Sequence, residues 1–528
     1  MFEASVSALL LLVATAAVIT VIRWGWKMVE RVWLNPKRLE RELRKQNLKA
    51  NPYRLWFGDL KEMVQMQEKV TSISMSSHSH DLPPYVVPFV HHLVNKYGKN
   101  SFMWFGTTPR VILMDPEQVK EAFNRNYDFP RPEAILIVKY MATGVANYED
   151  EKWAKHRKII NPAFHSEQLK ALMPSFSQSC NEMIRKWEDM LSSSSDGTCE
   201  MDVRPWLKNF TEDAISRTAF GSNYEEGRKI FQLLSELGDL IMKNVIRYHN
   251  SLWSVVYAKE KRRMKEINRM LEASLMRIIE KKEKAMKLAE AANKSDLLGI
   301  ILESNHKDIK ERGNKNNNVG LSMKDVIEEC KLFYFAGQET SSSMLAWTMM
   351  LLAKYPDWQV RAREEVLRVF GNQTPDHDGL SRLKILTMIL YEVLRLYPPA
   401  GWLTRCPKRD MKLGNLLVPA GVQVLLPILM LHHDKGIWGD DAGEFKPERF
   451  SEGISKAGKG ASSAAFFPFG WGPRICIGLN FALLEAKMVL SLILQRFCFE
   501  LSPTYSHAPH YNLTIQPRHG VHIILHKL

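Results

Sequence analysis

The sequence predicts a mainly α-helical protein with a minor β portion, preceded by one N-terminal transmembrane helix. Three observations lead to this fold class: an uncharged stretch from Ala4 to Ile22, long helical patterns in the middle of the chain, and short β-branched runs elsewhere. The 528 residues contain no low-complexity linker and no internal repeat, so we expect one large folded unit. We assign residues 1–35 to an anchor and linker and residues 36–528 to a single domain.

The anchor is assigned from its length and its flanks. At about 1.5 Å per residue, the stretch from Ala4 to Ile22 is just long enough to cross a hydrocarbon core of ~30 Å. A cleaved signal peptide is the alternative, because Ala14-Thr15-Ala16 resembles a cleavage site, but Glu3 and the long apolar run favour the anchor. Basic residues dominate from Arg23 to Lys49, which places the rest of the chain in the cytoplasm. Pro36 is expected to stop the helix.

The body reads as helices with a few short strands. Residues 101–114 are expected to form two strands around a turn, since β-branched and aromatic residues flank Gly106 and Pro109. An exposed loop is expected at 305–319, and short strands and long loops are expected at 398–473. The predicted helices are residues 259–292, 323–354, 381–397 and 478–496.

Charge and cysteine usage narrow the functional classes. The formal net charge of +14 is compatible with nucleic acid, an anionic membrane surface or an acidic protein partner. Because the basic residues are interleaved with acids and no nucleic-acid motif is found, we expect no nucleic-acid partner. The six cysteines are scattered without a CxxC pair, which is typical of a reducing compartment. Five are interpreted as buried small side chains.

The sixth, Cys476, lies in the segment FGWGPRICIG (469–478), directly before a predicted helix. The positive end of that helix and its unpaired N–H groups are expected to lower the pKa of the thiol and hold a thiolate. Gly472 and Gly478 permit a tight loop beside a flat ring. The segment resembles the cytochrome P450 haem signature F-x-x-G-x-R-x-C-x-G at all five fixed positions.

That resemblance implies the cytochrome P450 fold, a haem b cofactor and Cys476 as the axial thiolate ligand of its iron. Phe469 would shield the sulfur from water, and Trp153, Arg157, Arg405 and Arg474 would hold the haem propionates. The family's substrate contacts imply roles for loops around 130–145 and 400–404, where Trp402 could reshape the pocket.

A second motif is Ala336-Gly337-Gln338-Glu339-Thr340, an acid and a hydroxyl in an otherwise apolar helix. Gly337 is expected to leave a groove for a small ligand. In the family this is the oxygen-binding segment, so the resemblance implies that Thr340 and Glu339 relay protons. The alternative is a threonine that bonds back to a carbonyl of its own helix.

A third motif is structural. Glu392 and Arg395 share one helix face, and the resemblance implies a network with Arg449 in the segment PERF (447–450). Glu365/Arg368 and Glu182/Arg185 have the same spacing and are interpreted as exposed pairs.

Several longer stretches, among them HRKIINPAF (156–164) and VIEECKLFYFAGQET (326–340), resemble the plant subfamily that contains secologanin synthase and triterpenoid oxidases. This implies an NADPH- and O2-dependent monooxygenase of the endoplasmic reticulum membrane that oxidises a terpenoid. Electrons must come from outside, because no flavin or nicotinamide fingerprint is found. The implied partners are NADPH-cytochrome P450 reductase and cytochrome b5. The alternatives are a haem-thiolate isomerase or dehydratase that does not use O2, a non-enzymatic haem sensor, and a membrane-tethered scaffold without haem.

Overall fold

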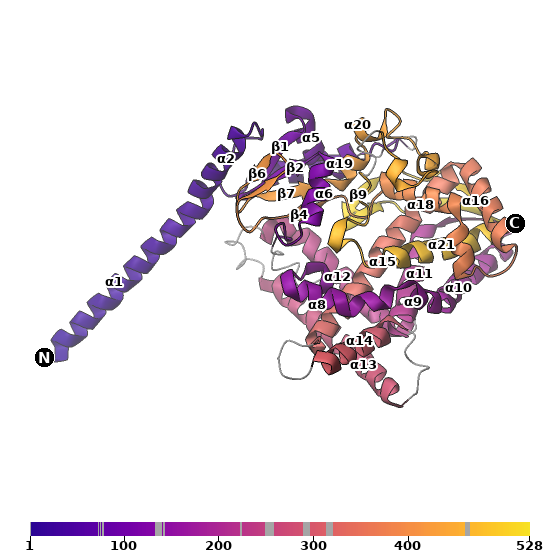
Figure 1. Ribbon diagram of the computed structural model, residues 1–528, viewed down its shortest axis with the longest axis horizontal. Helices are drawn as coiled ribbons and strands as arrows, with labels where there is room; N and C mark the ends of the chain where they lie inside the picture. Colours follow the sequence, from indigo (N-terminus) through magenta and orange to yellow (C-terminus); the bar gives the residue numbers. More distant parts are fainter. Residues whose placement is uncertain are drawn as a thin grey trace.

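The structure, a computed structural model, has a body of helices and small sheets from which one long helix projects (Figure 1). It describes residues 2–71, 73, 75–76, 79–132, 140, 143–221, 224–248, 258–288, 296–312, 320–459 and 465–528. The mainly α fold with a minor β portion is confirmed.

The projecting helix is longer than predicted. Helix α1 (Phe2–Val29) continues through a π-helical turn, η1 (Glu30–Leu34), into α2 (Asn35–Lys45). The expectation that Pro36 stops the helix is therefore wrong. Pro36 lies in the first turn of α2, and the wider π turn before it accommodates the missing N–H and the ring. The segment Leu10–Lys45 is long and apolar enough to span a membrane, and its most apolar part is not buried against the body.

Helices make up most of the body. They are α3 (Leu60–Thr71), α4 (Pro83–Val86), α5 (Pro88–Tyr97), α6 (Pro116–Asn124), α7 (Gly144–Asn147), α8 (Asp150–Ile160), α9 (Ser166–Ala171), α10 (Met173–Ser192), α11 (Val203–Phe220), α12 (Tyr224–Tyr248), α13 (Ala258–Leu288), α14 (Leu297–Arg312), α15 (Met323–Lys354), α16 (Pro356–Phe370), α17 (His377–Arg382), α18 (Lys384–Leu396), α19 (Ile428–His432), α20 (Lys435–Trp438) and α21 (Leu479–Arg496). Short 3-10 turns include η3 (Asn161–Phe164), η5 (Pro447–Phe450), η6 (Ile454–Lys456) and η8 (Gly472–Arg474).

The predicted helix at 323–354 is confirmed to the residue as α15, because Ser322 and Asp325 form a capping box at its start. The predicted helix at 381–397 is interrupted at Leu383, between α17 and α18. The loop expected at 305–319 is wrong for its first part, which continues α14. The Asn305 side chain fixes this turn by donating to the Leu321 carbonyl at 3.1 Å. Residues 289–292 and 313–319 of these predictions lie outside the described residues.

Within the described residues the strands form four small sheets. β1 (Asn100–Phe105), β2 (Thr108–Leu113), β7 (Gln423–Leu426) and β4 (Leu403–Arg405) make a four-stranded sheet in that order, in which β2 and β7 are parallel. β3 (Thr198–Asp202), β11 (His522–Lys527) and β8 (Phe497–Leu501) make an antiparallel sheet. The remaining pairs are β5 (Met411–Leu413) with β6 (Leu416–Val418), and β9 (Pro509–Asn512) with β10 (Thr514–Pro517). The two strands predicted at 101–114 are confirmed as β1 and β2.

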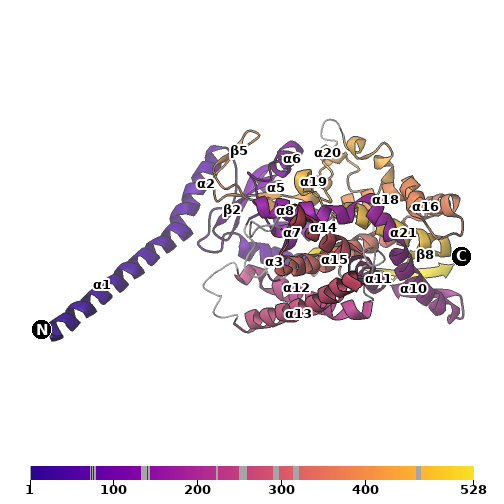
Figure 2. The same cartoon turned by 60° about the horizontal axis from the view of Figure 1, so that its bottom comes forward.

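Helix α15 runs through the centre of the body and organises the core (Figure 2). It packs against α11 on one side and against α18 and β10 on others. Ser343 Oγ and Trp347 Nε1 both donate to the Ile515 carbonyl, at 2.7 and 2.8 Å, which fixes β10 to the helix. The two conspicuous motifs, on α15 and before α21, are thus held by elements of one continuous core.

Candidate active site

The segment around Cys476 forms a closed loop that leads from η8 into α21. The Cys476 backbone N–H donates to the Phe469 carbonyl at 2.9 Å, so the loop folds back on the residue that opens the motif. Gly472 has a φ of +70°, and a Cβ there would lie 2.7 Å from Asn124 Oδ1, so only glycine fits. A Cβ on Gly478 would meet only the Cys476 sulfur, at 3.9 Å. The sulfur is therefore held beside a bare stretch of backbone.

The Cys476 side chain has an open side, yet protein surrounds it closely enough that burial raises the pKa of its thiol. The Gly478 N–H, Arg157 and Arg131 act in the opposite direction without reversing the shift. The expectation that the helix end lowers this pKa is therefore wrong for the protein alone, because desolvation exceeds the effect of the donors. A thiol that binds a metal ion is deprotonated outright, so the thiolate would depend on the bound iron.

Three of the predicted cofactor-binding side chains meet around this loop. Arg157 Nη1, from α8, donates to the Ile475 carbonyl at 3.0 Å, next to Cys476. The Arg474 guanidinium lies 4.6 Å from the ring centroid of Trp153, also from α8. Arg474 Nη2 donates to Glu149 Oε2 at 2.6 Å, so this guanidinium already has one carboxylate partner from the protein.

Arg405 and a residue that the sequence did not point to, Arg131, complete the cationic set. Arg405 is buried on β4, and its pKa is lowered to about 9 by burial, Arg131 and Arg474. The pKa of Arg131 is lowered to about 10 by burial and by Arg474. Glu149 compensates only in part, so three guanidinium groups repel one another in a confined space. The only local signal for Arg131 is its position between two prolines, Pro130 and Pro132.

These side chains fit a haem. Arg405 Nε, Arg474 Nε and Arg474 Nη1 are buried and have no hydrogen-bond partner among the described residues. Guanidinium groups with unused donors suit carboxylates, and the excess of positive charge suits an anionic group. The donor set and the open sulfur together match a ring that carries propionates and a thiolate-bound iron.

The residues of the motif on α15 face different surroundings. Thr340 is exposed although it lies in the middle of a largely buried helix, so it opens into the interior. Its Oγ1 donates to the Ala336 carbonyl at 2.8 Å, which is the back-bonded arrangement. The groove expected at Gly337 is not found, because a Cβ there would lie 2.8 Å from Ile215 Cδ1. Gly337 instead allows α11 to approach α15 closely.

Glu339 faces another side of α15 from Thr340. Its Oε1 accepts hydrogen bonds from Thr514 Oγ1 at 3.0 Å and from Gln516 Nε2. It lines a polar cavity of about 200 Å³, together with Arg204 and Lys208 of α11. Burial raises the pKa of Glu339, and Thr514, Lys208 and Arg204 oppose the rise. A carboxyl group whose pKa is raised in this way keeps its proton to a higher pH than an exposed carboxyl group does, and at the edge of a polar cavity it can serve as a proton donor.

The network predicted around Glu392 is present. Arg395 Nε and Nη2 donate to the two oxygens of Glu392 at 2.7 and 2.8 Å, and both side chains are fully buried. Arg449 Nε lies 3.4 Å from Glu392 Oε1. Arg395 Nη1 also donates to the His432 carbonyl at 2.8 Å. The ring of His432, another residue without a sequence signal, accepts from Phe467 N at 2.9 Å, which connects the network to the cysteine loop.

The two comparison pairs are not exposed pairs, so that interpretation is wrong. Glu365 is buried and accepts from the backbone N–H groups of Lys384, Ile385 and Leu386 at 2.7, 2.8 and 3.0 Å. It therefore caps α18 from a neighbouring helix. Glu182 pairs with Arg217 at 2.9 Å across two helices.

Of the predicted substrate loops, residues 133–139 and 141–142 lie outside the described residues. In the other loop, the Trp402 ring stacks on Tyr511 of β9, with centroids 4.3 Å apart and an interplanar angle of 25°. Trp402 is thus anchored to the β9–β10 hairpin.

Comparisons with known proteins agree with this geometry. A model of the cytochrome P450 family matches residues 85–523. The 11-oxo-beta-amyrin 30-oxidase of Glycyrrhiza uralensis is 58% identical to this chain, and the alignment covers 96% of each sequence. The 11-oxo-beta-amyrin 30-oxidase of Medicago truncatula is 56% identical, with 95% of each sequence aligned. Cytochrome P450 72A15 of Arabidopsis thaliana is 50% identical over 98% of this chain and 99% of its own. With the family model covering most of the chain and these relatives aligned over nearly their whole lengths, the chain belongs to the cytochrome P450 family of haem monooxygenases.

Proposed function

We propose that the chain is an NADPH- and O2-dependent monooxygenase that oxidises a hydrophobic plant terpenoid, most specifically a triterpenoid. The observation that carries the proposal is the cysteine loop with its set of arginines, which suits a thiolate-bound haem. The substrate class rests on two relatives named 11-oxo-beta-amyrin 30-oxidase, at 58% and 56% identity.

In this proposal Cys476 would bind the iron of haem b, and Phe469 would keep water from the sulfur. The propionates would be held by Trp153, Arg157, Arg405, Arg474 and Arg131. The bound haem supplies the chemistry that activates dioxygen. The Glu392–Arg395–Arg449 network has a structural role, since His432 transmits its position to the backbone before the cysteine loop.

Proton supply falls to Thr340 and Glu339, in separate roles. Thr340 presents a hydroxyl to the interior, and its bond to the Ala336 carbonyl orients the Oγ1 atom. Glu339 would hold its proton at Oε2, because Oε1 accepts hydrogen bonds from Thr514 and Gln516, which orient the carboxyl group at the polar cavity. A relay between them needs water, because they face different sides of α15.

Electrons come from NADPH through NADPH-cytochrome P450 reductase, and cytochrome b5 is a second candidate donor. The net charge of +14 supports an acidic partner surface. Residues 1–35 anchor the protein in the endoplasmic reticulum membrane, and residues 36–528 form the cytoplasmic catalytic domain. The apolar, unburied helix Leu10–Lys45 supports the anchor.

The test is turnover with defined partners. Microsomes that contain the full chain and the reductase are incubated with triterpenoids of the beta-amyrin skeleton, iridoids and gibberellins, and products are followed by mass spectrometry. We expect a gain of one oxygen that requires NADPH and is labelled by 18O2. Cys476→Ser is expected to lose the reduced carbon monoxide band that gives the family its name.

Thr340→Ala tests the proton supply, with Thr340→Ser as the matched control that keeps the hydroxyl. We expect Thr340→Ala to retain the carbon monoxide band but to divert NADPH use from product to peroxide, while Thr340→Ser stays coupled. Equal coupling in both variants would remove Thr340 from the mechanism. Product formation from a hydroperoxide without NADPH would instead support the isomerase or dehydratase alternative.

A further inference from the structure

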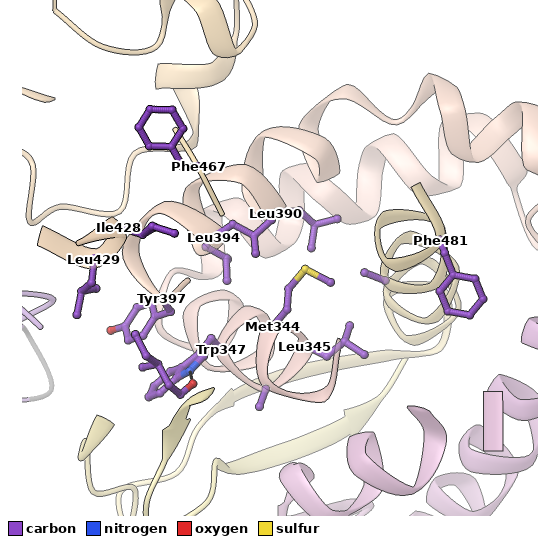
Figure 3. Close-up of a cluster of buried hydrophobic side chains, with 14 of the residues drawn as sticks. Met344, Leu345, Trp347, Leu390, Leu394, Tyr397, Ile428, Leu429, Phe467 and Phe481 are labelled. Atoms are coloured by element: carbon purple, nitrogen blue, oxygen red, sulfur yellow. Dashed lines mark hydrogen bonds between the residues drawn. The ribbon is translucent and has the colours of Figure 1, made fainter. Parts of the chain in front are cut away.

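A line of oxidisable side chains leads away from α15 through the core. Trp347 of α15 stacks on Tyr397, the residue after α18, with ring centroids 4.2 Å apart and an interplanar angle of 22°. Both rings are fully buried. Figure 3 shows the two rings side by side, with Met344 on the same helix. Tryptophan and tyrosine are the side chains that lose one electron most readily, so this contact joins two electron donors.

The Tyr397 hydroxyl lies between two imidazoles. His80 Nδ1 is 2.6 Å from Tyr397 Oη, and His507 Nε2 is 3.3 Å from it. Burial lowers the pKa of His80 well below its usual value and that of His507 to about 4, so both rings are neutral at pH 7. The Lys354 ammonium donates to His80 Nε2 at 3.2 Å, so the hydrogen of His80 is on Nδ1 and is donated to Tyr397 Oη, which leaves His507 Nε2 to accept the phenolic proton. A phenol loses an electron readily only if its proton can leave at the same time, and this site provides the base.

The line continues toward the surface. Tyr355 Oη lies 2.9 Å from His80 Nε2, and Tyr505 Oη lies 2.8 Å from His507 Nδ1. Tyr355 and Tyr505 are both partly exposed, whereas Tyr397 is not. Each imidazole thus connects the buried phenol to a second phenol nearer to solvent.

The inner end of the line points back to the candidate active site. Trp347 follows Thr340 by seven residues, which is two helical turns, so the two side chains lie on the same face of α15 about 10 Å apart along the axis. Met344 occupies that face between them. The line of donors therefore begins with Trp347, on the face of α15 that carries Thr340, and ends at the partly exposed phenols.

We propose that Trp347 and Tyr397, with His80 and His507, remove an oxidising equivalent from the haem when it is oxidised in the absence of substrate. Tyr397 gives up one electron, through Trp347, to the oxidised haem, which is reduced by that electron. The phenolic proton passes to His507 Nε2, 3.3 Å from the Tyr397 hydroxyl, leaving a neutral tyrosyl radical and an imidazolium. A one-electron reductant of the thiol or ascorbate class, acting at Tyr355 or Tyr505, returns the electron, and the proton returns from His507. The proposal rests on the proposed function, in which the haem is bound by Cys476.

The experiment uses the full-length holoenzyme, mixed with hydrogen peroxide without substrate, frozen rapidly and examined by electron paramagnetic resonance. We expect a tyrosyl radical in the wild type that loses most of its intensity in Tyr397→Phe and forms more slowly in Trp347→Phe. Tyr334→Phe is the matched control: Tyr334 is a buried tyrosine of the same helix, but it stacks on Phe220, which is far harder to oxidise. This variant should keep the wild-type signal.

Two further readouts separate the possible failures. A spin-trap adduct located at Tyr397 by peptide mass spectrometry would support the proposal without any substitution, and Tyr397→Phe should lose its haem absorption faster under peroxide. Wild-type radical intensity and bleaching rate in Tyr397→Phe, with the carbon monoxide band intact, would overturn the radical line alone. Absence of that band from the wild type would overturn the proposed function and this inference with it.

Discussion

At the scale of single residues, the crowded arginines behind the cysteine loop have opposite effects on the stability of the haem-free and the haem-bound protein. Burial lowers the pKa values of Arg131, Arg405 and Arg474, and Arg474 lowers those of Arg131 and Arg405 further, so these charges repel where no anion compensates them. A carboxylate at the unused donors of Arg405 and Arg474 would turn this repulsion into attraction. The same side chains should therefore destabilise the empty protein and retain the cofactor.

Arg405→Gln tests both halves of this argument. Because a charge-assisted hydrogen bond contributes about 1.5–3 kcal/mol, we expect haem to transfer to an acceptor globin roughly tenfold faster or more. The haem-free variant should unfold at a higher urea concentration than the haem-free wild type. Arg409→Gln, an exposed arginine four residues away, is the control and should change neither value. Wild-type haem transfer from Arg405→Gln would contradict the assignment.

A second residue-scale prediction concerns Glu485, buried on α21. Burial raises the pKa of Glu485 to about 8 from 4.5, and Ser341 of α15 only partly opposes the rise. A raised carboxyl pKa means that the stability present below pH 4.5 is lost as the pH rises to about 8. This loss has a slope of up to roughly 1.4 kcal/mol per pH unit.

Glu485→Gln, which cannot ionise, should lack this slope. We expect its free energy of unfolding, relative to the wild type, to increase steadily between pH 5 and about pH 8 in urea titrations. The exposed Glu364, replaced by Gln, should leave the pH profile of the wild type unchanged. A constant difference between Glu485→Gln and the wild type across this range would show that Glu485 is ionised throughout.

Residue-scale prediction from the sequence succeeded where one segment carries the whole pattern. Trp153, Arg157 and Arg474 could be found because they stand in local motifs that place them around Cys476. Arg131 and His432 could not, because their partners come from distant segments. The sign of the Cys476 pKa shift was also missed, since desolvation depends on everything packed around the loop.

At the scale of elements, the start of α18 is fixed by a side chain from α16. Glu365 accepts from three successive backbone N–H groups that have no partner within the helix. Because α18 carries Glu392 and Arg395, this cap also positions the network behind the cysteine loop.

Glu365→Ala should therefore lower the free energy of unfolding by about 2 kcal/mol, as expected for a buried cap with unpaired donors. Glu365→Gln should cost less, because its carbonyl oxygen can still accept. Glu364→Ala, on the exposed side of the same helix, is the control. Urea unfolding of the three variants checks the order, and equal losses in Glu364→Ala and Glu365→Ala would argue against the cap.

Element boundaries were predictable where local chemistry marks them. The capping box at Ser322 and Asp325 marks the start of α15, and Pro356 follows shortly after its end. The end of α14 carried no such signal, because its last turn is polar and its stability comes from Asn305 bonding to Leu321. The continuation of the N-terminal helix through Pro36 depends on a π turn that periodicity does not predict.

At the scale of the whole molecule, the pairing of the strands into sheets could not be predicted from local sequence patterns. β2 and β7 are parallel neighbours although about three hundred residues separate them, for instance Arg110 from Gln423. Each strand was plausible from its own residues, but their pairing depends on how the helices between them pack. The mainly α class was predictable from composition and periodicity, and the strand order was not.

The long helix that leaves the body sets how the whole molecule meets a membrane. Its apolar part is exposed along the described turns, from Leu10 to Ile22, and contacts nothing in the body. Trp24, Trp26 and Trp33 follow on the side of the body, where tryptophan favours the interface between lipid and water. A charge placed within the apolar part must therefore enter hydrocarbon, whereas a charge placed after Trp26 need not.

Val13→Asp combined with Val18→Asp tests this arrangement. Each aspartate at the centre of a span costs about 2.5–3.5 kcal/mol, so the double variant should be released from microsomes by alkaline carbonate, which leaves the wild type in the pellet. Val29→Asp, at the end of α1 and nearer to the body, is the control and should remain in the pellet. The haem spectrum should be unchanged in all three proteins, because α1 does not contribute to the core. If the double variant stays in the pellet after carbonate treatment as the wild type does, the surface of the body attaches the protein to the membrane, and the projecting helix is not the anchor.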